Sequence, residues 1–289
     1  YCHVETIREP LLRREFGSDK GTLYEGTVVD FYPEWEGSFE LKTGDDKKGR
    51  VHIAKVIHAL QGGEGRPFFG EKAQGRAWVP DSGVHDDNWF HPDFDDSNWT
   101  TGTNGAGYEA GEGFETLISP NFNFIEKMHY KATSLYLRFP FEIENIDAIN
   151  SAKNILLRMK CGDGFVAYLN GHQVARMNAP EKTRWNSRAA SSGDDGANST
   201  FMAFNINKNR DKLRKGRNVL AIHGLNIRPE STDLLMVAEM QTNDHDYQDA
   251  IWELIDEEAF YRFWTLEGLL SFWDGYSGNR NNFFIYLNP

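Results

Sequence analysis

The sequence has little cysteine and none of the common nucleotide- or metal-binding motifs. Cys2 and Cys161 are the only cysteines in 289 residues, which excludes a disulfide framework and a CxxC metal pair. The nine histidines are scattered, without H-x-x-x-H metal spacing. No G-x-S-x-G nucleophile elbow, P-loop or Rossmann glycine string occurs. The sequence therefore gives no indication of a serine hydrolase, a P-loop enzyme or a dinucleotide-binding enzyme.

Basic residues and long apolar runs are also scarce. Lys and Arg number 31 against 43 Asp and Glu, a net charge of −12. Nucleic-acid binding needs clustered positive charge, so we expect no nucleic-acid partner. No run approaches the roughly 18 apolar residues of a membrane helix, so we expect no membrane span. The sequence starts without Met and stops just after an apparent strand, and we expect both ends to be cut.

Aromatic residues, by contrast, are abundant: eight Trp, eleven Tyr and twenty Phe. The length is enough for one large domain or two ordinary ones, each with its own core. Most aromatic side chains lie in the core of a protein, but a β-structure with a sugar-binding surface would also use them there. The composition is that of a globular protein.

Three regions differ in pattern. Residues 1–62 mix helical and extended segments; for example, Pro10 opens a helical stretch that Gly17 ends. Residues 63–75 are rich in glycine and have the composition of a linker.

Residues 76–243 are β-patterned throughout. Apolar residues alternate strictly over 135–143 and again over 155–161. Asn170-Gly171 follows a further strand and predicts a two-residue hairpin turn. Many short strands separated by polar turns indicate an antiparallel sandwich or jelly roll.

In residues 244–289 the apolar residues again have helical spacing. This segment ends in the motif that gives the strongest indication of a chemical function. Asp274 leaves an apolar helix, enters a glycine-rich loop and is followed by amides and a hydrophobic strand. Protein kinases use this layout, with an Asp that orients the substrate hydroxyl and an Asn five residues later that holds a metal. Asp274 and Asn279 have that spacing. A capped turn, in which Asp and Asn bond their own backbone, explains it equally well.

A family resemblance extends this kinase reading to both ends of the chain. It rests on residues 11–17 (LLRREFG), 21–26 (GTLYEG), 39–43 (FELKT), 260–270 (FYRFWTLEGLL), 273–276 (WDGY) and 281–286 (NNFFIY). These segments resemble the CotH family, bacterial spore-coat and secreted proteins with an atypical protein-kinase fold.

The resemblance implies ATP, Mg or Mn, and transfer of phosphate to a protein hydroxyl, with Asp274 catalytic. The family's register makes Asn282 the metal ligand, whereas kinase spacing favours Asn279, and both stand as candidates. The family's nucleotide-contacting Lys and its second metal-binding Asp have no counterpart in this chain. We therefore expect this chain to be inactive by itself; the resemblance implies kinase activity only for a full-length parent.

The middle region carries a second resemblance. Residues 94–99 (FDDSNW), 161–174 (CGDGFVAYLNGHQV) and 218–222 (NVLAI) resemble galactose-binding-like jelly rolls of secreted bacterial proteins. This makes Asp95, Asp96 and Asp163 candidates for contact with sugar or calcium. A loop that caps itself is the plainer reading for Asp95 and Asp96. Likewise Trp99 is more simply a core residue than a sugar platform.

The sequence thus predicts a discontinuous α+β kinase-like fragment, residues 1–62 and 244–289, joined through the linker 63–75 to an inserted all-β antiparallel sandwich, residues 76–243. The first functional hypothesis is a fragment of a CotH-type kinase acting on protein. The alternative is a non-catalytic carbohydrate-binding or structural protein; a sandwich that serves only as a spacer is a third reading. The resemblances imply a secreted or cell-surface bacterial location.

Overall fold

The computed structural model describes residues 7–32, 35–61, 63, 65–70, 72–191, 200–244 and 247–289. Cys2 lies outside these ranges. The chain divides into two compact units: residues 1–60 with 247–289, called unit 1 here, and residues 61–246, called unit 2.

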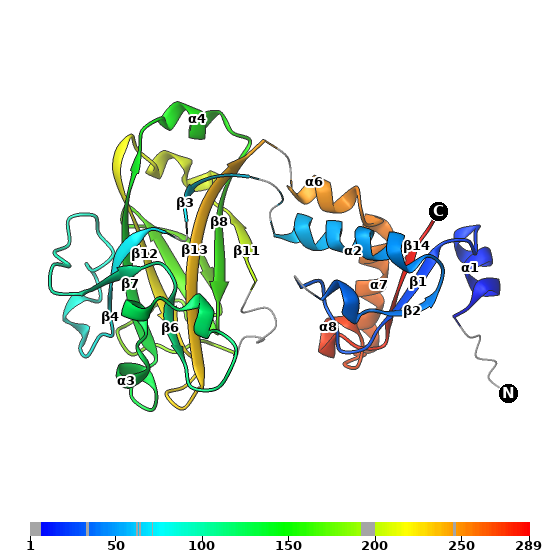
Figure 1. Ribbon diagram of the computed structural model, residues 1–289, viewed down its shortest axis with the longest axis horizontal. Coiled ribbons are helices and arrows are strands. Elements are labelled where there is room, and N and C mark those ends of the chain that lie inside the picture. The colour runs from blue at the N-terminus through cyan, green and yellow to red at the C-terminus, as the bar shows by residue number, and fades with distance from the viewer. Residues whose placement is uncertain are drawn as a thin grey trace. The chain divides into compact units, whose positions relative to one another are not determined.

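Unit 2 is an antiparallel β-sandwich (Figure 1). One sheet has the order β10-β9-β12-β7-β4-β5, with strands β4 (Gln74–Trp78), β5 (Thr100–Thr103), β7 (Ser134–Ile143), β9 (Gly164–Leu169), β10 (His172–Met177) and β12 (Gly216–Leu225). The other has the order β11-β8-β13-β3, and β6 also pairs with β13; its strands are β3 (Arg66–Phe69), β6 (Ala106–Glu109), β8 (Asn154–Cys161), β11 (Met202–Asn205) and β13 (Asp233–Asn243).

The alternating apolar residues of the sequence form the core of this sandwich. Leu137 and Phe139 of β7 and Leu157 of β8 are completely buried between the sheets, because every second side chain of a strand points to the same face. The predicted antiparallel sandwich is confirmed. The predicted hairpin is confirmed as well, since Asn170 (φ +49°) and Gly171 (φ +87°) both take the left-handed conformation that a two-residue turn requires.

The two ends of unit 2 lie side by side. Arg66 at the start of β3 faces Thr242 near the end of β13. The Arg66 guanidinium also pairs with Asp244 at 2.6 Å. Residues 66–69 are therefore a strand, although the glycine-rich stretch 63–75 predicts a linker. The prediction fails here because Phe69, 5% exposed, packs in the sandwich core despite its glycine-rich surroundings.

Short helical segments connect the strands of unit 2. They are η2 (Gly83–His85), η3 (Glu115–Leu117), η4 (Pro120–Phe122), α3 (Ile125–Met128), α4 (Ile146–Ser151) and η5 (Asn207–Lys212). Among the described residues of both units, no helix is long and apolar enough to cross a membrane.

Unit 1 has a three-stranded antiparallel sheet of order β14-β1-β2. Its elements are α1 (Glu9–Phe16), β1 (Thr22–Gly26), η1 (Glu36–Ser38), β2 (Glu40–Thr43), α2 (Asp46–Leu60), α6 (Tyr247–Trp252), α7 (Glu257–Leu270), α8 (Tyr276–Asn279) and β14 (Phe283–Leu287). Its small core gathers Tyr24, Phe39, Ile53 and Phe283.

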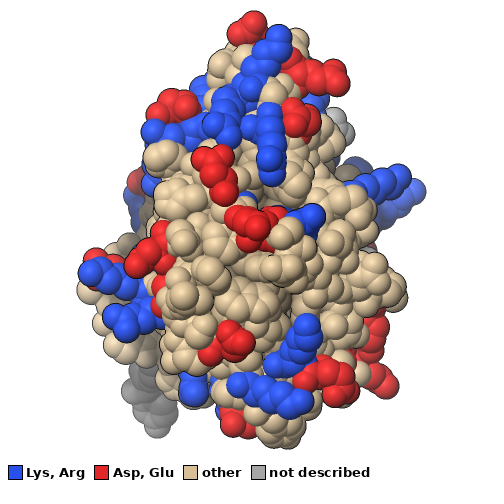
Figure 2. Space-filling model, turned by 90° about the vertical axis from the view of Figure 1, so that its left-hand side faces the viewer, with Lys and Arg blue, Asp and Glu red and all other residues tan. Residues whose placement is uncertain are grey.

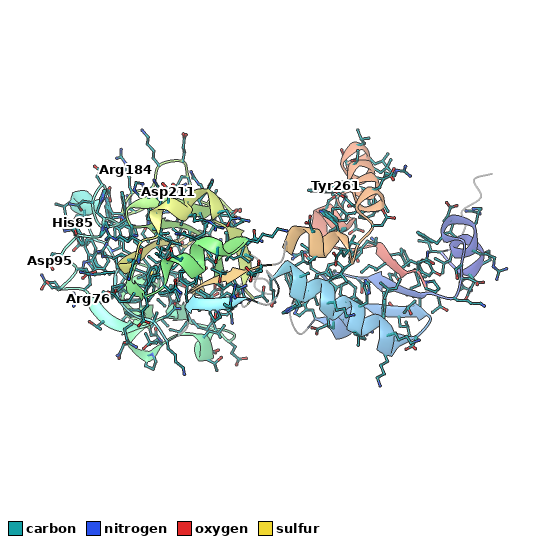
Figure 3. The ribbon with its side chains drawn as sticks, turned by 90° about the horizontal axis from the view of Figure 1, so that it is seen from above. Arg76, His85, Asp95, Arg184, Asp211 and Tyr261 are labelled. Atoms are coloured by element: carbon teal, nitrogen blue, oxygen red, sulfur yellow. The ribbon has the colours of Figure 1, made fainter. Side chains whose placement is uncertain are left out.

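Helix α7 begins after Asp256, whose carboxylate accepts a hydrogen bond from the backbone N–H of Ala259 at 2.9 Å. Its apolar residues, however, stay largely uncovered. Leu269, Leu270 and Trp273 just beyond it are 77%, 75% and 74% exposed, and the side chain of Tyr261 is visible on the helix in Figure 3. The predicted kinase-like α+β domain is not supported, since the described part of unit 1 does not enclose this helix.

Candidate functional sites

Asp274 lies in the turn between α7 and α8, and three asparagine side chains surround its carboxylate. Asn279 Nδ2 donates to Asp274 Oδ1, and Asn282 Nδ2 donates to Oδ2, each at 2.6 Å. Asn281 Nδ2 donates to Oδ1 at 3.3 Å. The structure therefore brings together the three residues that the sequence singles out here, and adds Asn281, which the sequence analysis missed.

The backbone of this turn is held by Glu267, a buried residue of α7. Its carboxylate accepts the N–H groups of Tyr276 at 3.0 Å and Ser277 at 2.8 Å. Arg280 (φ +60°) and Asn282 (φ +51°) are in the left-handed region, which costs a non-glycine residue about 1 kcal/mol or more. The turn is thus a tightly specified loop that encloses one carboxylate.

The chemistry of this loop is that of a capped carboxylate. Amide nitrogens face both oxygens of Asp274, while the buried Asn279 Oδ1 has no hydrogen-bond partner. A divalent metal would need oxygen ligands on that side. Within the described ranges, no group of three His, Cys, Asp or Glu is placed to hold a metal ion.

In unit 2, Asp96 belongs to a buried ion-pair network. Its two carboxylate oxygens pair with Arg76 at 2.9 Å and with Arg138 at 2.7 Å. Arg138 is only 1% exposed and also donates to the carbonyl oxygens of Trp89 and His91. Asp96 therefore fastens the loop 79–99 to the outer face of β4 and β7.

Asp95 caps its own loop. It is exposed, and its carboxylate accepts the N–H of Ser97 at 3.0 Å. That backbone hydrogen bond lowers the pKa of Asp95 below its ordinary value. Trp99 is half-buried and packs against buried Trp89 and half-buried Trp78, with the ring centroids of Trp99 and Trp78 5.5 Å apart; it is thus a packing residue at the edge of a buried cluster. Arg76, His85 and Asp95 lie on the same side of the sandwich (Figure 3). Figure 2 faces that side, where acidic residues are scattered rather than gathered.

Asp163 is buried and holds a different loop of unit 2 through hydrogen bonds. It is 8% exposed, its Oδ2 accepts the N–H of Ile227 at 2.6 Å, and its carbonyl accepts Asn178 Nδ2 at 2.9 Å. Asp163 thus fixes the β12–β13 connection, residues 226–232. Neither Asp96 nor Asp163 presents an open carboxylate arrangement for sugar or calcium.

His223 of β12 is completely buried on the outer face of the sheet that also contains β4 and β7. Its Nε2 shares a hydrogen bond of 2.9 Å with Ser134 Oγ, and its ring meets Tyr136 edge-on at 4.7 Å. Burial lowers the pKa of His223 to about 3. This histidine is therefore neutral at physiological pH and packs against the rings of Trp89 and Tyr136.

Tyr130, which the sequence analysis did not select, is the most unusual exposed aromatic of the sandwich. It precedes β7, is 69% exposed, and has φ +61°, a conformation that bulky side chains rarely adopt. Its N–H donates to Pro229 O at 2.7 Å. No sequence signal predicts this, because tyrosine has no intrinsic preference for a positive φ.

Two tilted ring contacts, called the aromatic column here, link Tyr130 to the buried core. Its ring lies 4.4 Å from that of His129, which in turn lies 5.8 Å from buried Tyr108. Tyr108 is fixed by two hydrogen bonds: its hydroxyl donates to Ser231 O and accepts from Asn226 Nδ2, both at 2.9 Å. The exposed ring is thus the outer end of an anchored column.

No family model matches the chain, and no curated protein matches it. Among solved structures, the chain is similar to a β-glucuronidase of Bacteroides uniformis (17% identity, TM-score 0.35, covering 61% of this chain and 18% of that one). It is also similar to β-glucuronidases of an uncultured Clostridium sp. (12%, 0.37, 62% and 30%) and of Ruminococcus gnavus (10%, 0.33, 54% and 21%). The chain spans less than a third of each of these proteins.

The predicted CotH-type kinase function is wrong. The amide nitrogens of Asn279 and Asn282 face the Asp274 carboxylate, and within the described residues no group of three His, Cys, Asp or Glu is placed to hold the metal that a kinase needs. The physical reason is that a capped turn around Asp274 produces the same spacing as a catalytic loop. ATP, Mg or Mn and a protein substrate depended on that reading, so none of them is retained.

Proposed function

We propose that unit 2 binds carbohydrate and that the exposed ring of Tyr130 is its stacking platform. The chain is then a non-catalytic carbohydrate-binding or structural protein that a bacterium secretes or displays on its surface. The observation that carries the proposal is a tyrosine held exposed, in a left-handed conformation, on an anchored aromatic column.

The platform has the chemistry that a sugar needs. A tyrosine ring offers a large, rigid apolar surface together with a polar hydroxyl, which suits the C–H face of a pyranose. Polar side chains that can reach the hydroxyl groups of a sugar lie on both segments beside the ring. Lys131 follows Tyr130, and Arg228 and Glu230, both exposed, flank Pro229. A ligand of mixed apolar and hydroxyl character fits this surface.

The strain at Tyr130 supports a functional reading. A left-handed non-glycine residue costs about 1 to 2 kcal/mol, and such residues persist where the surrounding structure fixes them, often at binding sites. The Pro229 carbonyl and the His129 ring provide that fixation. Nothing in the core requires the ring, because it lies outside the buried cluster.

The test is retention of the full chain on insoluble polysaccharides and on a glycan array. We expect Tyr130→Ala to weaken binding at least about tenfold, the loss of roughly 1.4 kcal/mol of stacking, and Tyr130→Trp to preserve it. Val84→Ala is the matched control, because Val84 is 72% exposed on another loop of unit 2. A glycan bound equally well by Tyr130→Ala, or no glycan bound at all, contradicts the proposal.

A further inference from the structure

A groove of about 500 Å³ opens on unit 2 between β3 and β7. Its lining residues come from β3, the β3–β4 turn, β7 and β13, and include none of the residues around Tyr130. Small-molecule sites span roughly 300 to 1,000 Å³, so the groove has the size of a site for one small ligand.

Aromatic rings form the apolar part of this groove. Phe68 and Phe141, both half-buried, have ring centroids 6.4 Å apart, and Phe69 beneath lies 5.5 Å from Phe141. The groove therefore offers ring surfaces from both sheets, since β3 and β7 belong to different sheets. Flat apolar groups pack well against such surfaces.

Two of the lining residues are charged, Lys72 and Glu239. Glu239 is already paired with Arg158 at 2.9 Å. Lys72 is exposed, and among the described residues the structure shows no ion pair for it. Lys72 is therefore the charged lining residue that a ligand can pair with.

We propose that this groove binds a small molecule with a flat ring and an acidic group, that is, an aromatic carboxylate. The ring packs against Phe68 and Phe141, and the carboxylate pairs with Lys72. This site is independent of the platform at Tyr130, and each can fail without the other.

The test uses benzoate as the probe and the full chain, by ligand-observed NMR and calorimetry. We expect a Kd on the order of 1 mM and at least about fivefold weaker binding of benzyl alcohol, which keeps the ring but lacks the charge. Glucuronate, which carries the carboxylate without an aromatic ring, should bind as weakly as benzyl alcohol does.

Two variants locate the binding. Lys72→Gln should weaken benzoate about threefold to fivefold, whereas Lys182→Gln, an exposed lysine elsewhere in unit 2, should not. Gly70→Leu should fill the groove without backbone strain, because Gly70 has no positive φ and its added Cβ meets Glu239 only at 3.5 Å. Binding that survives Gly70→Leu, or that benzyl alcohol matches, overturns the proposal, as does absence of benzoate binding in the unmodified chain.

Discussion

Unit 2 buries its apolar residues and unit 1 leaves many of them uncovered. In the sandwich, two sheets cover each other, and Leu137 and Leu157 have no exposed surface. In unit 1, a three-stranded sheet and its helices enclose Ile53 and Phe283, yet Leu269 remains 77% exposed. Trp264 and Leu266 of the same helix are also exposed, so unit 1 packs α7 less completely than unit 2 packs its strands.

The polar groups of the two units do not differ in the same way. The outer face of the larger sandwich sheet holds a buried guanidinium and a buried imidazole, each with a hydrogen-bond partner. Each unit also leaves buried polar atoms without a partner: Asn279 Oδ1 in unit 1, and His85 Nδ1, Arg158 Nε and Asn209 Oδ1 in unit 2. The two units therefore differ in how far they cover apolar side chains and not in how completely they pair polar ones.

The largest effect is expected from the buried guanidinium of unit 2. Arg138→Met should lower the free energy of unfolding of unit 2 by about 3 to 5 kcal/mol, because it leaves Asp96 half-paired and two backbone carbonyls without donors. Hydrogen exchange of peptides from β7 and β12 measures the effect within unit 2 alone.

Arg76→Met is the matched control for that measurement. Arg76 pairs with the same carboxylate, but 37% of its side chain is exposed, so the loss should stay below about 1 kcal/mol. Equal losses for the two variants would show that the buried network contributes nothing beyond an ordinary surface pair.

The next effect is a pH dependence confined to the sandwich. The pKa of buried His223 is about 3, below its ordinary value of 6.5, so the unfolded state binds a proton that the folded state refuses. Stability from this residue is complete above pH 6.5 and is lost as the pH falls toward 3. We expect unit 2 to lose about 3 kcal/mol between pH 7 and pH 4.

Substitution of this histidine separates its contribution from that of the carboxylates. His223→Phe fits among Tyr136 and Trp89, and Ser134 keeps its bond to Ser187 O. Urea unfolding of the two proteins at pH 7, 5.5 and 4 should show a shallower decline for the variant. Parallel declines would mean that His223 is protonated in the folded state.

The smallest effect is expected on α7. Replacing Leu269 and Leu270 together by Gln should change the unfolding free energy of unit 1 by less than about 0.5 kcal/mol and increase solubility, because the two side chains are already exposed. Ile53→Ala, at a site 1% exposed, should cost roughly 2 to 4 kcal/mol. A large loss from the double Gln variant would show that α7 is covered in solution.

Periodicity predicted the elements that bury one face. The alternation over 135–143 became β7, the Asn170-Gly171 pair became the hairpin turn, and helix α1 ended at Gly17, which has φ +73°. Strand β3 was missed, because the glycine-rich sequence around it has the composition of a linker. It is a strand through pairing with β13, a contact between distant parts of the chain that local composition does not contain.

The sites were harder to predict than the elements. The motif around Asp274 did bring its predicted partners together, but the same spacing serves a capped carboxylate, so spacing alone did not reveal chemistry. Asp96 was selected as a candidate ligand and is instead half of a structural network. Tyr130 left no trace in the sequence, because its exposure and its backbone conformation depend on Pro229, about a hundred residues away along the chain.

The pairing of Arg66 with Thr242 has a mechanical consequence. The chain enters β3 and leaves β13 at the same end of this antiparallel pair, so tension applied through the two ends of unit 2 pulls the strands apart sideways. Their hydrogen bonds then carry the load one after another instead of together. The sandwich should therefore peel open from β3 at low force, and a force-extension curve should show an early, shallow step before the remaining strands give way.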